Sequence, residues 1–160
     1  MDKYIKNLLI NAKTDSASIA NASSLSKNEF LLHLEKQLMS NKTKIISENK
    51  KDLTLAKKND LDPAFIDRLV INGKTIDSMC EGLRNIYSLN DPIGNIENIN
   101  VRPNGLKIGK MRVPLGVILI IYESRPNVTI DVAALGVKSG NSVILRGGSE
   151  ALHSNLFLGK

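Results

Sequence analysis

Two short polar segments, each directly after an apolar run, carry residue types that suit an anion site. Residues 122–127 (YESRPN) follow GVILII, and residues 146–150 (RGGSE) follow SVIL. In the second segment, Gly147 and Gly148 let backbone approach a ligand closely, and the Arg146 guanidinium can bind a phosphate through two hydrogen bonds. The N–H groups of a following helix would add to such a site. These features are typical of a nucleotide site.

The elements before these segments predict that they lie together. Residues 117–122 and the SVILR run read as strands, and the continuous apolar run GVILIIY is typical of a strand covered on both faces in a parallel sheet. Residues 129–138 have helical spacing, and Gly140-Asn141 ends that helix. Strand, helix and strand form a βαβ unit whose two strands end at one sheet edge, where ligands bind in open α/β sheets.

The first 90 residues are predicted to be helical from the spacing of their apolar side chains. Two such stripes are Ile5, Leu8, Leu9 and Ala12, and Phe30, Leu31, Leu34 and Leu38. Ser26 to Glu29 has the form of a capping box. Asp62-Pro63 predicts an N-cap and a helix to about Ile71 that Asn72-Gly73 ends, and another helix is expected over residues 75–88.

A β-hairpin is predicted over residues 99–113. Apolar and polar side chains alternate there around Pro103-Asn104-Gly105, and Asn-Gly suits the positive φ angles of a tight turn. With Lys and Arg on one face, the hairpin is expected to project from the body of the protein.

Composition limits the function classes. The 160 residues are 42% hydrophobic, which indicates a globular chain; its net charge of +6 is spread along the sequence, and aromatic content of 4% leaves few platforms for stacking bases. We therefore predict no nucleic-acid binding, and interpret the Lys-rich residues 42–59 as a solvated helix face.

The sequence also indicates the compartment. One cysteine excludes a disulfide framework, and no apolar run approaches the ~20 residues of a membrane span. The first residues do not have the pattern of a signal peptide. We expect a cytoplasmic protein.

His33 and His153 have no second histidine or carboxylate at metal-ligand spacing, so no metal site is predicted. From the residues alone, the interpretation of residues 146–150 as a nucleotide site has an alternative. A strand followed by Gly-Gly is also common at ordinary turns, and the G-x-G-x-x-G fingerprint is missing.

Residues 113–155, which contain YESRPNVT and VILRGGSEA, closely resemble glutamate-5-semialdehyde dehydrogenases (gamma-glutamyl phosphate reductases) of the aldehyde dehydrogenase superfamily. The hairpin and the helical half, including DPAFIDRL, are similar to that family too, so the resemblance covers the chain. It implies an α/β, aldehyde-dehydrogenase-like fold: a helical part (1–98), a hairpin of oligomerisation type (99–113), and the start of an NADP-binding Rossmann-like domain (114–160).

The implied reaction is NADPH-dependent reduction of L-glutamyl 5-phosphate to L-glutamate 5-semialdehyde and phosphate, in proline biosynthesis. Family members use a cysteine thiolate from a catalytic domain downstream of VILRGGSEA. Cys80 does not match it, since it sits at helical spacing in the N-terminal part. We therefore expect the chain to be a truncated, inactive N-terminal part of a homo-oligomeric enzyme. The alternative is a non-catalytic oligomerisation or interaction module.

The resemblance also implies roles for the cofactor side of the two segments. Arg146 is expected to bind the 2′-phosphate of NADPH; the alternative is that it is a surface arginine without a ligand. Gly147 and Gly148 would allow the backbone to approach the cofactor closely; the alternative is that they only form a turn. Either Ser149 or Glu150 would hold the ribose hydroxyls.

For the first segment, Tyr122 and Glu123 are taken as cofactor-binding. Arg125 is expected to meet the substrate's phosphate or carboxylate, with a salt bridge to Glu123 as the alternative for that pair. Asn127 is either an oxyanion donor or a helix N-cap.

Overall fold

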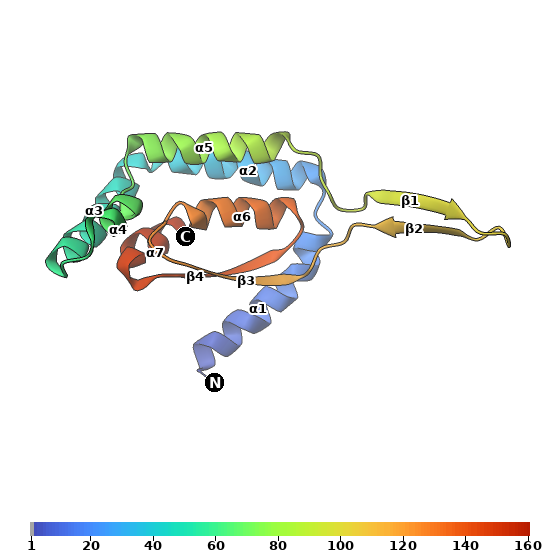
Figure 1. Cartoon of the computed structure of the whole chain (residues 1–160), viewed down its shortest axis with the longest axis horizontal. Helices are drawn as coiled ribbons and strands as arrows, with labels where there is room; N and C mark the ends of the chain where they lie inside the picture. Colours follow the sequence, from blue (N-terminus) through green and yellow to red (C-terminus); the bar gives the residue numbers. More distant parts are fainter. Residues whose placement is uncertain (1) are drawn as a thin grey trace.

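The computed structural model describes residues 2–160 (Figure 1). Its helices are α1 (Lys3–Ala20), α2 (Ser24–Ser40), α3 (Lys42–Lys58), α4 (Pro63–Leu69), α5 (Gly73–Ser88), α6 (Val128–Lys138) and α7 (Leu152–Leu158), with a 3₁₀ turn η1 (Ser149–Ala151). Its strands are β1 (Ile96–Val101), β2 (Lys107–Met111), β3 (Val117–Tyr122) and β4 (Ser142–Gly147). None of the helices in residues 2–160 is long and apolar enough to cross a membrane.

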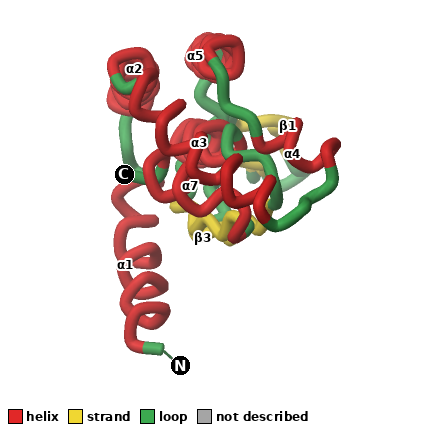
Figure 2. The backbone as a smooth tube through the Cα atoms, turned by 90° about the vertical axis from the view of Figure 1, so that its left-hand side faces the viewer, coloured by secondary structure: helices red, strands yellow, loops and turns green. Residues whose placement is uncertain are grey.

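The helices and the β3–β4 sheet are arranged in layers. Helices α2 and α5 run side by side over α6, and α6 lies on one face of the sheet (Figure 1). Helix α1 contacts the other face through β4 and then extends away from the body (Figure 2). The main core lies between α2, α3, α5 and α6, and its most buried side chains are Leu31, Leu38, Ile45, Ile76, Leu83, Ile130 and Ala134. The helical half and the βαβ unit therefore share one core.

The first apolar stripe lies on a helix, as predicted, but it does not form a buried face. Only Ala12 of its four members is buried, while Ile5, Leu8 and Leu9 are exposed. The reason is that α1 meets the sheet on a small contact and leaves its N-terminal turns uncovered (Figure 2). The second stripe also lies on a predicted helix, in which Leu31 and Leu38 are buried and Phe30 is 39% exposed.

Helix boundaries confirm one prediction and correct two. The Asp62 carboxylate accepts from the Ala64 N–H at 2.8 Å with Pro63 at the first helical position, as predicted. The helix ends at Leu69 instead of Ile71, and Asn72 begins α5 by forming a capping box with Thr75. Asn-Gly therefore starts a helix here instead of ending one.

Helix α2 begins at Ser24 with Ser23 as its N-cap, so the predicted capping box at Ser26 is wrong. The Ser26 N–H donates to Ser23 Oγ at 3.1 Å. The earlier start adds a first turn in which the Ser24 hydroxyl and the Lys27 ammonium both donate to Asp91. Asp91 thus adds a distant partner to a first turn that Ser23 caps locally.

Strands β3 and β4 pair in parallel around α6, which confirms the predicted βαβ unit. Gly136 of α6 allows close packing on the sheet, because a Cβ there would lie 2.6 Å from Val143 Cγ1. The prediction that β3 is covered on both faces is wrong: Leu119 is 58% exposed and Ile121 63% exposed. Within residues 2–160, α1 contacts this face mainly through β4 and leaves these two β3 side chains open.

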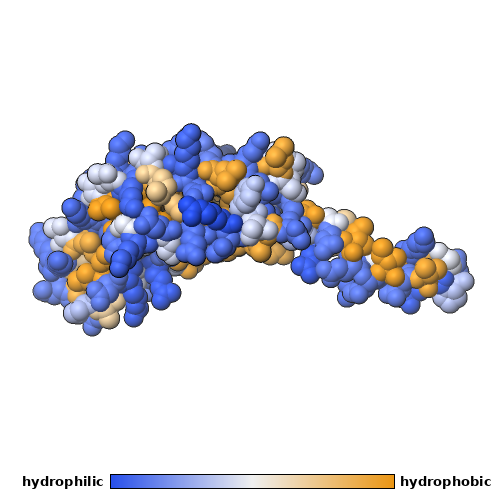
Figure 3. All heavy atoms as spheres, turned by 90° about the horizontal axis from the view of Figure 1, so that it is seen from above, coloured by the Kyte–Doolittle hydropathy of each residue, from blue (hydrophilic) through white to orange (hydrophobic). Residues whose placement is uncertain are grey.

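The hairpin is present, with β1 and β2 antiparallel and the turn at Pro103-Asn104-Gly105. Gly105 has φ +84°, the left-handed conformation that favours glycine, while Asn104 does not. The two strands project from the body, and apolar side chains are visible along the projection (Figure 3).

A buried carboxylate on α3 joins the helical half to the C-terminal elements. Asp52, 1% exposed, accepts from the backbone N–H groups of His153 (3.0 Å) and Ser154 (2.8 Å), and from the Ser154 hydroxyl (2.6 Å). His153 Nδ1 lies 2.8 Å from the same carboxylate. Helix α7 has no side-chain cap of its own. Asp52 therefore caps α7 from another element.

A second polar cluster lies where α2 meets the start of the hairpin. Lys27, 1% exposed, donates to both Asp91 oxygens, at 2.9 and 3.1 Å. Burial acts to raise the pKa of Asp91, but hydrogen bonds from Lys27, the Ile93 N–H and Ser24 outweigh it, and the net pKa lies below its ordinary 3.8. The nearby Lys138 is also buried and donates to Asn28 Oδ1 and the Tyr87 carbonyl; burial lowers its pKa.

Replacing Asp52 tests the α7 cap. We expect Asp52→Ala to lower the free energy of unfolding by about 3 kcal/mol, because two helix N–H groups and a buried hydroxyl lose their acceptor. Urea unfolding followed by circular dichroism measures this. Asp67→Ala, at an exposed aspartate on α4, is the control. A difference between the two variants below about 1 kcal/mol would show that the cap is not needed.

The Lys27–Asp91 pair predicts a pH dependence of stability. Since the folded pKa of Asp91 lies below the unfolded value of about 3.8, its contribution is complete above that pH and is lost as pH falls through the folded pKa. At pH 7 we expect Asp91→Asn to destabilise by about 3 kcal/mol, because Lys27 stays buried without its counter-charge. Urea unfolding should show that the difference in unfolding free energy between wild type and Asp91→Asn becomes smaller as the pH falls below about 3.8. A gap that stays constant down to pH 2.5 would contradict the assignment.

Candidate functional site

The pairing of β3 with β4 brings the two chemistry-bearing segments to one edge of the sheet. The register runs from Val117 opposite Ser142 to Tyr122 opposite Gly147, so residues 122–127 and 146–150 leave the strands side by side. The predicted juxtaposition is therefore confirmed. We call these two segments together the rim.

A direct hydrogen bond joins the two halves of the rim. The backbone N–H of Ser124 donates to Glu150 Oε1 at 2.6 Å. Ser124 is buried and has φ +40°, in the left-handed region that non-glycine residues rarely adopt. Glu150, predicted as one of two ribose ligands, thus has one carboxylate oxygen engaged by the opposite segment.

The chain's own side chains fill the space beside both rim glycines. A Cβ at Gly147 would lie 2.1 Å from Asn155 Nδ2 of α7, and a Cβ at Gly148 would lie 2.1 Å from Glu150 Oε1. Neither glycine has a positive φ. A side chain at either position would therefore have to displace Asn155 or Glu150.

Tyr122 points toward α6 and takes part in a small hydrogen-bonded network. Its hydroxyl lies 2.5 Å from Thr129 Oγ1, and Thr129 Oγ1 lies 3.3 Å from Asn155 Oδ1. The sequence pointed to Tyr122 but missed Thr129 and Asn155. Their only signal is that each lies in the first turns of a helix following a rim segment.

Arg146 lies on the opposite face of the sheet from Tyr122. It pairs in register with Ile121, its side chain is exposed, and it makes no ion pair within residues 2–160. Ser149 is also exposed. Arg146 is thus a cation at the rim without a charge partner among the described residues.

The two charged residues of the first segment do not pair with each other. Glu123 and Arg125 are both exposed, and residues 2–160 contain no ion pair between them. The backbone bends between them at Ser124, which has φ +40°, so the segment is not extended, and the salt-bridge alternative is wrong. Both side chains face solvent at the rim.

Asn127 does not cap α6 with its side chain, so the N-cap alternative is wrong. Asn127 has helical backbone angles, and its Nδ2 donates to Asp131 Oδ2 at 3.3 Å, one turn along the helix. Burial raises the pKa of Asp131, and the hydrogen bond from Asn127 opposes that effect. One N–H of the Asn127 amide is used in this contact.

Cys80 lies far from the rim, in the core shared by α2, α5 and α6. It is 1% exposed, and burial raises the pKa of its thiol, with the nearby Glu35 adding to the effect. A nucleophilic cysteine needs an exposed site and a lowered pKa. Cys80 is a core residue, as its helical spacing predicts.

The two histidines lie on different helices and contact different side chains. His33 Nε2 lies 3.3 Å from Gln37 Nε2 on α2. His153 does contact a carboxylate, Asp52, which the sequence analysis missed because 101 residues separate them. No group of three or more His, Cys, Asp or Glu in residues 2–160 is arranged to hold a metal ion.

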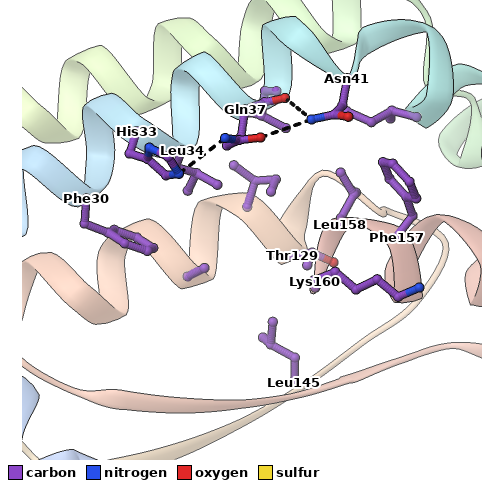
Figure 4. Close-up of a pocket in the computed structure, with 15 residues that line it drawn as sticks. Phe30, His33, Leu34, Gln37, Asn41, Thr129, Leu145, Phe157, Leu158 and Lys160 are labelled. Atoms are coloured by element: carbon purple, nitrogen blue, oxygen red, sulfur yellow. Dashed lines mark hydrogen bonds between the residues drawn. The ribbon is translucent and has the colours of Figure 1, made fainter.

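Two hollows lie near the sheet. A groove of about 570 Å³ runs between α2 and the α6–α7 pair, lined mainly by apolar side chains that include Phe30, Leu34, Leu145 and Phe157 (Figure 4). A smaller hollow of about 380 Å³ is lined by Leu55, Ala56, Asn59, Leu61, Phe65, Ser149 and Glu150. The larger groove lies away from Arg146, whereas the smaller one reaches the rim itself.

No family model matches the sequence. Among curated proteins, the gamma-glutamyl phosphate reductase of Carboxydothermus hydrogenoformans is 54% identical over 99% of this chain, and that of Petrotoga mobilis is 50% identical over 97%. The chain spans 38% and 37% of these two relatives' own lengths.

Solved structures agree with these sequence relatives. The gamma-glutamyl phosphate reductases of Thermotoga maritima and Saccharomyces cerevisiae are 37% and 31% identical, each with a TM-score of 0.88 over 92% of this chain and over 36% and 38% of theirs. A putative aldehyde dehydrogenase from Bacillus subtilis, 18% identical, shares the fold with a TM-score of 0.73 over 98% of this chain and 32% of its own. Over nearly its whole length, the chain thus matches the N-terminal part of gamma-glutamyl phosphate reductases in sequence and in aldehyde-dehydrogenase-like fold.

Proposed function

We propose that residues 1–160 contribute the N-terminal part of an enzyme that reduces L-glutamyl 5-phosphate to L-glutamate 5-semialdehyde and phosphate with NADPH, in proline biosynthesis. The chain spans 38% of a relative named for this activity, so the activity is proposed for an enzyme of the relatives' length. Within it, residues 1–98 would form a helical part, 99–113 an association hairpin, and 114–160 the start of the cofactor domain.

The observation that carries this proposal is the exposed Arg146 guanidinium beside Gly147 and Gly148, with no ion pair within residues 2–160. A guanidinium suits a phosphate monoester, which it can bind through two hydrogen bonds. We assign Arg146 to the 2′-phosphate of NADPH. The bound cofactor supplies the hydride for the reduction.

The rest of the rim would shape and orient this site. Glu123, at the end of β3, faces solvent at the rim and is proposed to face the cofactor. Tyr122 would contribute through its ring, because its hydroxyl is engaged by Thr129.

The first segment would also serve the substrate. Exposed Arg125 is suited to the substrate's phosphate or carboxylate. The Asn127 amide uses one N–H on Asp131 and keeps a second for a developing oxyanion. The thiolate implied by the resemblance would come from outside residues 1–160, since Cys80 is buried in the helical core.

The cofactor assignment predicts a selective loss. We expect Arg146→Ala to weaken NADPH binding by about tenfold and NADH binding by less than about twofold, because only NADPH carries the 2′-phosphate. Titration calorimetry with both cofactors measures this, and Arg102→Ala, an equal charge change on the hairpin, is the control. An equal loss for the two cofactors, or wild-type protein that binds neither, would overturn the assignment.

A second candidate function, an association module, is favoured by the hairpin. Ile99, Val101 and Met111 are 60%, 65% and 56% exposed on a two-stranded sheet that nothing else in residues 2–160 covers. Such a hairpin is marginal in water unless it buries an apolar face. A second copy of this chain would cover it, and this role is compatible with the enzymatic one.

The association surface predicts concentration-dependent assembly. We expect the chain to dimerise in sedimentation velocity runs, and Val101→Lys to weaken the dimer by about tenfold or more, since a charge would enter an apolar contact. Leu25→Lys places the same charge at an equally exposed apolar position on α2 and should leave the dimer intact. A monomeric wild type at all concentrations would remove this candidate.

A further inference from the structure

Ser124 has a backbone conformation that needs external support. Its φ of +40° lies in the left-handed region, where the Cβ of an L-residue crowds its own carbonyl. Its side chain makes no hydrogen bond of the local kind that lets Asn or Asp adopt this region, and the residue is only 4% exposed. The turn after β3 therefore depends on contacts from elsewhere in the molecule.

Glu150 supplies the contact. Its Oε1 accepts from the Ser124 N–H at 2.6 Å, a short, charge-assisted hydrogen bond across 26 residues of sequence. The bond joins the end of β3 to the turn after β4. The donor is the Ser124 N–H, and the unusual φ is the rotation about the bond from this nitrogen to Cα.

Gly148 makes room for this carboxylate. A Cβ at position 148 would lie 2.1 and 2.2 Å from the two Glu150 carboxylate oxygens, so no other residue type fits without displacing Glu150. The φ of Gly148 is −68°, which any residue adopts. Glycine at position 148 is therefore needed to leave Glu150 in place, and not for the backbone conformation.

We propose that Ser124, Gly148 and Glu150 form a clasp that holds the first rim segment in its binding conformation, with Glu150 as a positioning residue and not a ribose ligand. The proposal rests on the cofactor role given to the rim above. It assigns the ribose contact to Ser149, which is exposed at the same turn and makes no side-chain hydrogen bond within residues 2–160.

The clasp has a signature that a direct cofactor contact lacks. If Glu150 acts by holding Ser124 at positive φ, then glycine at position 124, which adopts that φ freely, replaces part of its function. A residue that touched the cofactor itself would not be replaced by a glycine 26 positions away. Changes at the two positions must therefore be non-additive.

The test combines Glu150→Ala, Glu150→Gln, Ser124→Gly and the Glu150→Ala/Ser124→Gly double variant of the whole chain. Hydrogen exchange of the residue-124 amide, followed by NMR, reports the clasp, and NADPH titration reports the site. We expect Glu150→Ala to speed exchange of that amide by about tenfold or more. Glu150→Gln keeps an acceptor oxygen and should have a smaller effect.

In the NADPH titration, we expect Glu150→Ala to weaken binding by about tenfold and the double variant to recover most of that loss. Ser149→Ala should weaken binding without changing amide exchange at position 124. Unchanged exchange in Glu150→Ala, or a double variant no better than Glu150→Ala, would overturn the clasp. If the wild type binds no NADPH, the proposed cofactor role fails, and amide exchange alone still decides whether the clasp exists.

Discussion

The buried carboxylate of Asp52 is the contact on which the arrangement of the rim depends. It lies on α3, yet it accepts four hydrogen bonds or close polar contacts from His153 and Ser154 at the start of α7. Helix α7 follows directly on the turn that carries Glu150, and it carries Asn155, which fills the space beside Gly147. The helical half thus sets the position of the residues that shape the rim.

The rim itself is held mainly by internal contacts. Glu150 reaches across to Ser124, and Tyr122 is tied through Thr129 to Asn155, so the polar groups nearest the sheet are already paired. The groups left exposed are charged or small: Glu123 and Arg125 on the first segment, and Arg146 and Ser149 on the second. Such a division suits a binding site, because paired groups keep the backbone rigid while unpaired ones stay available.

Signals contained within a few residues could be read from the sequence, and signals that depend on distant partners could not. Asp62-Pro63 and Gly105 act through their own backbone geometry, and both were predicted correctly. At the start of α2 the Ser23 cap is local, but Asp91, the partner of Lys27, lies 64 residues away, and no local pattern contains that pairing. The same holds within the site: parallel pairing predicted the shared edge, but only coordinates show that Glu150 faces Ser124 instead of solvent.

The open face of the sheet gives the rim a second property. Leu119 and Ile121 of β3 are more than half exposed, on the face that also carries Arg146, since Ile121 and Arg146 are neighbours in register. Helix α1 contacts this face through β4, where Ile144, the in-register partner of Leu119, is 9% exposed. Apolar surface therefore leads directly to an unpaired cation at the sheet edge. On the proposed cofactor role, the apolar ring faces of a dinucleotide would lie on this surface and its phosphate would meet Arg146, whereas a free phosphate would contact only Arg146.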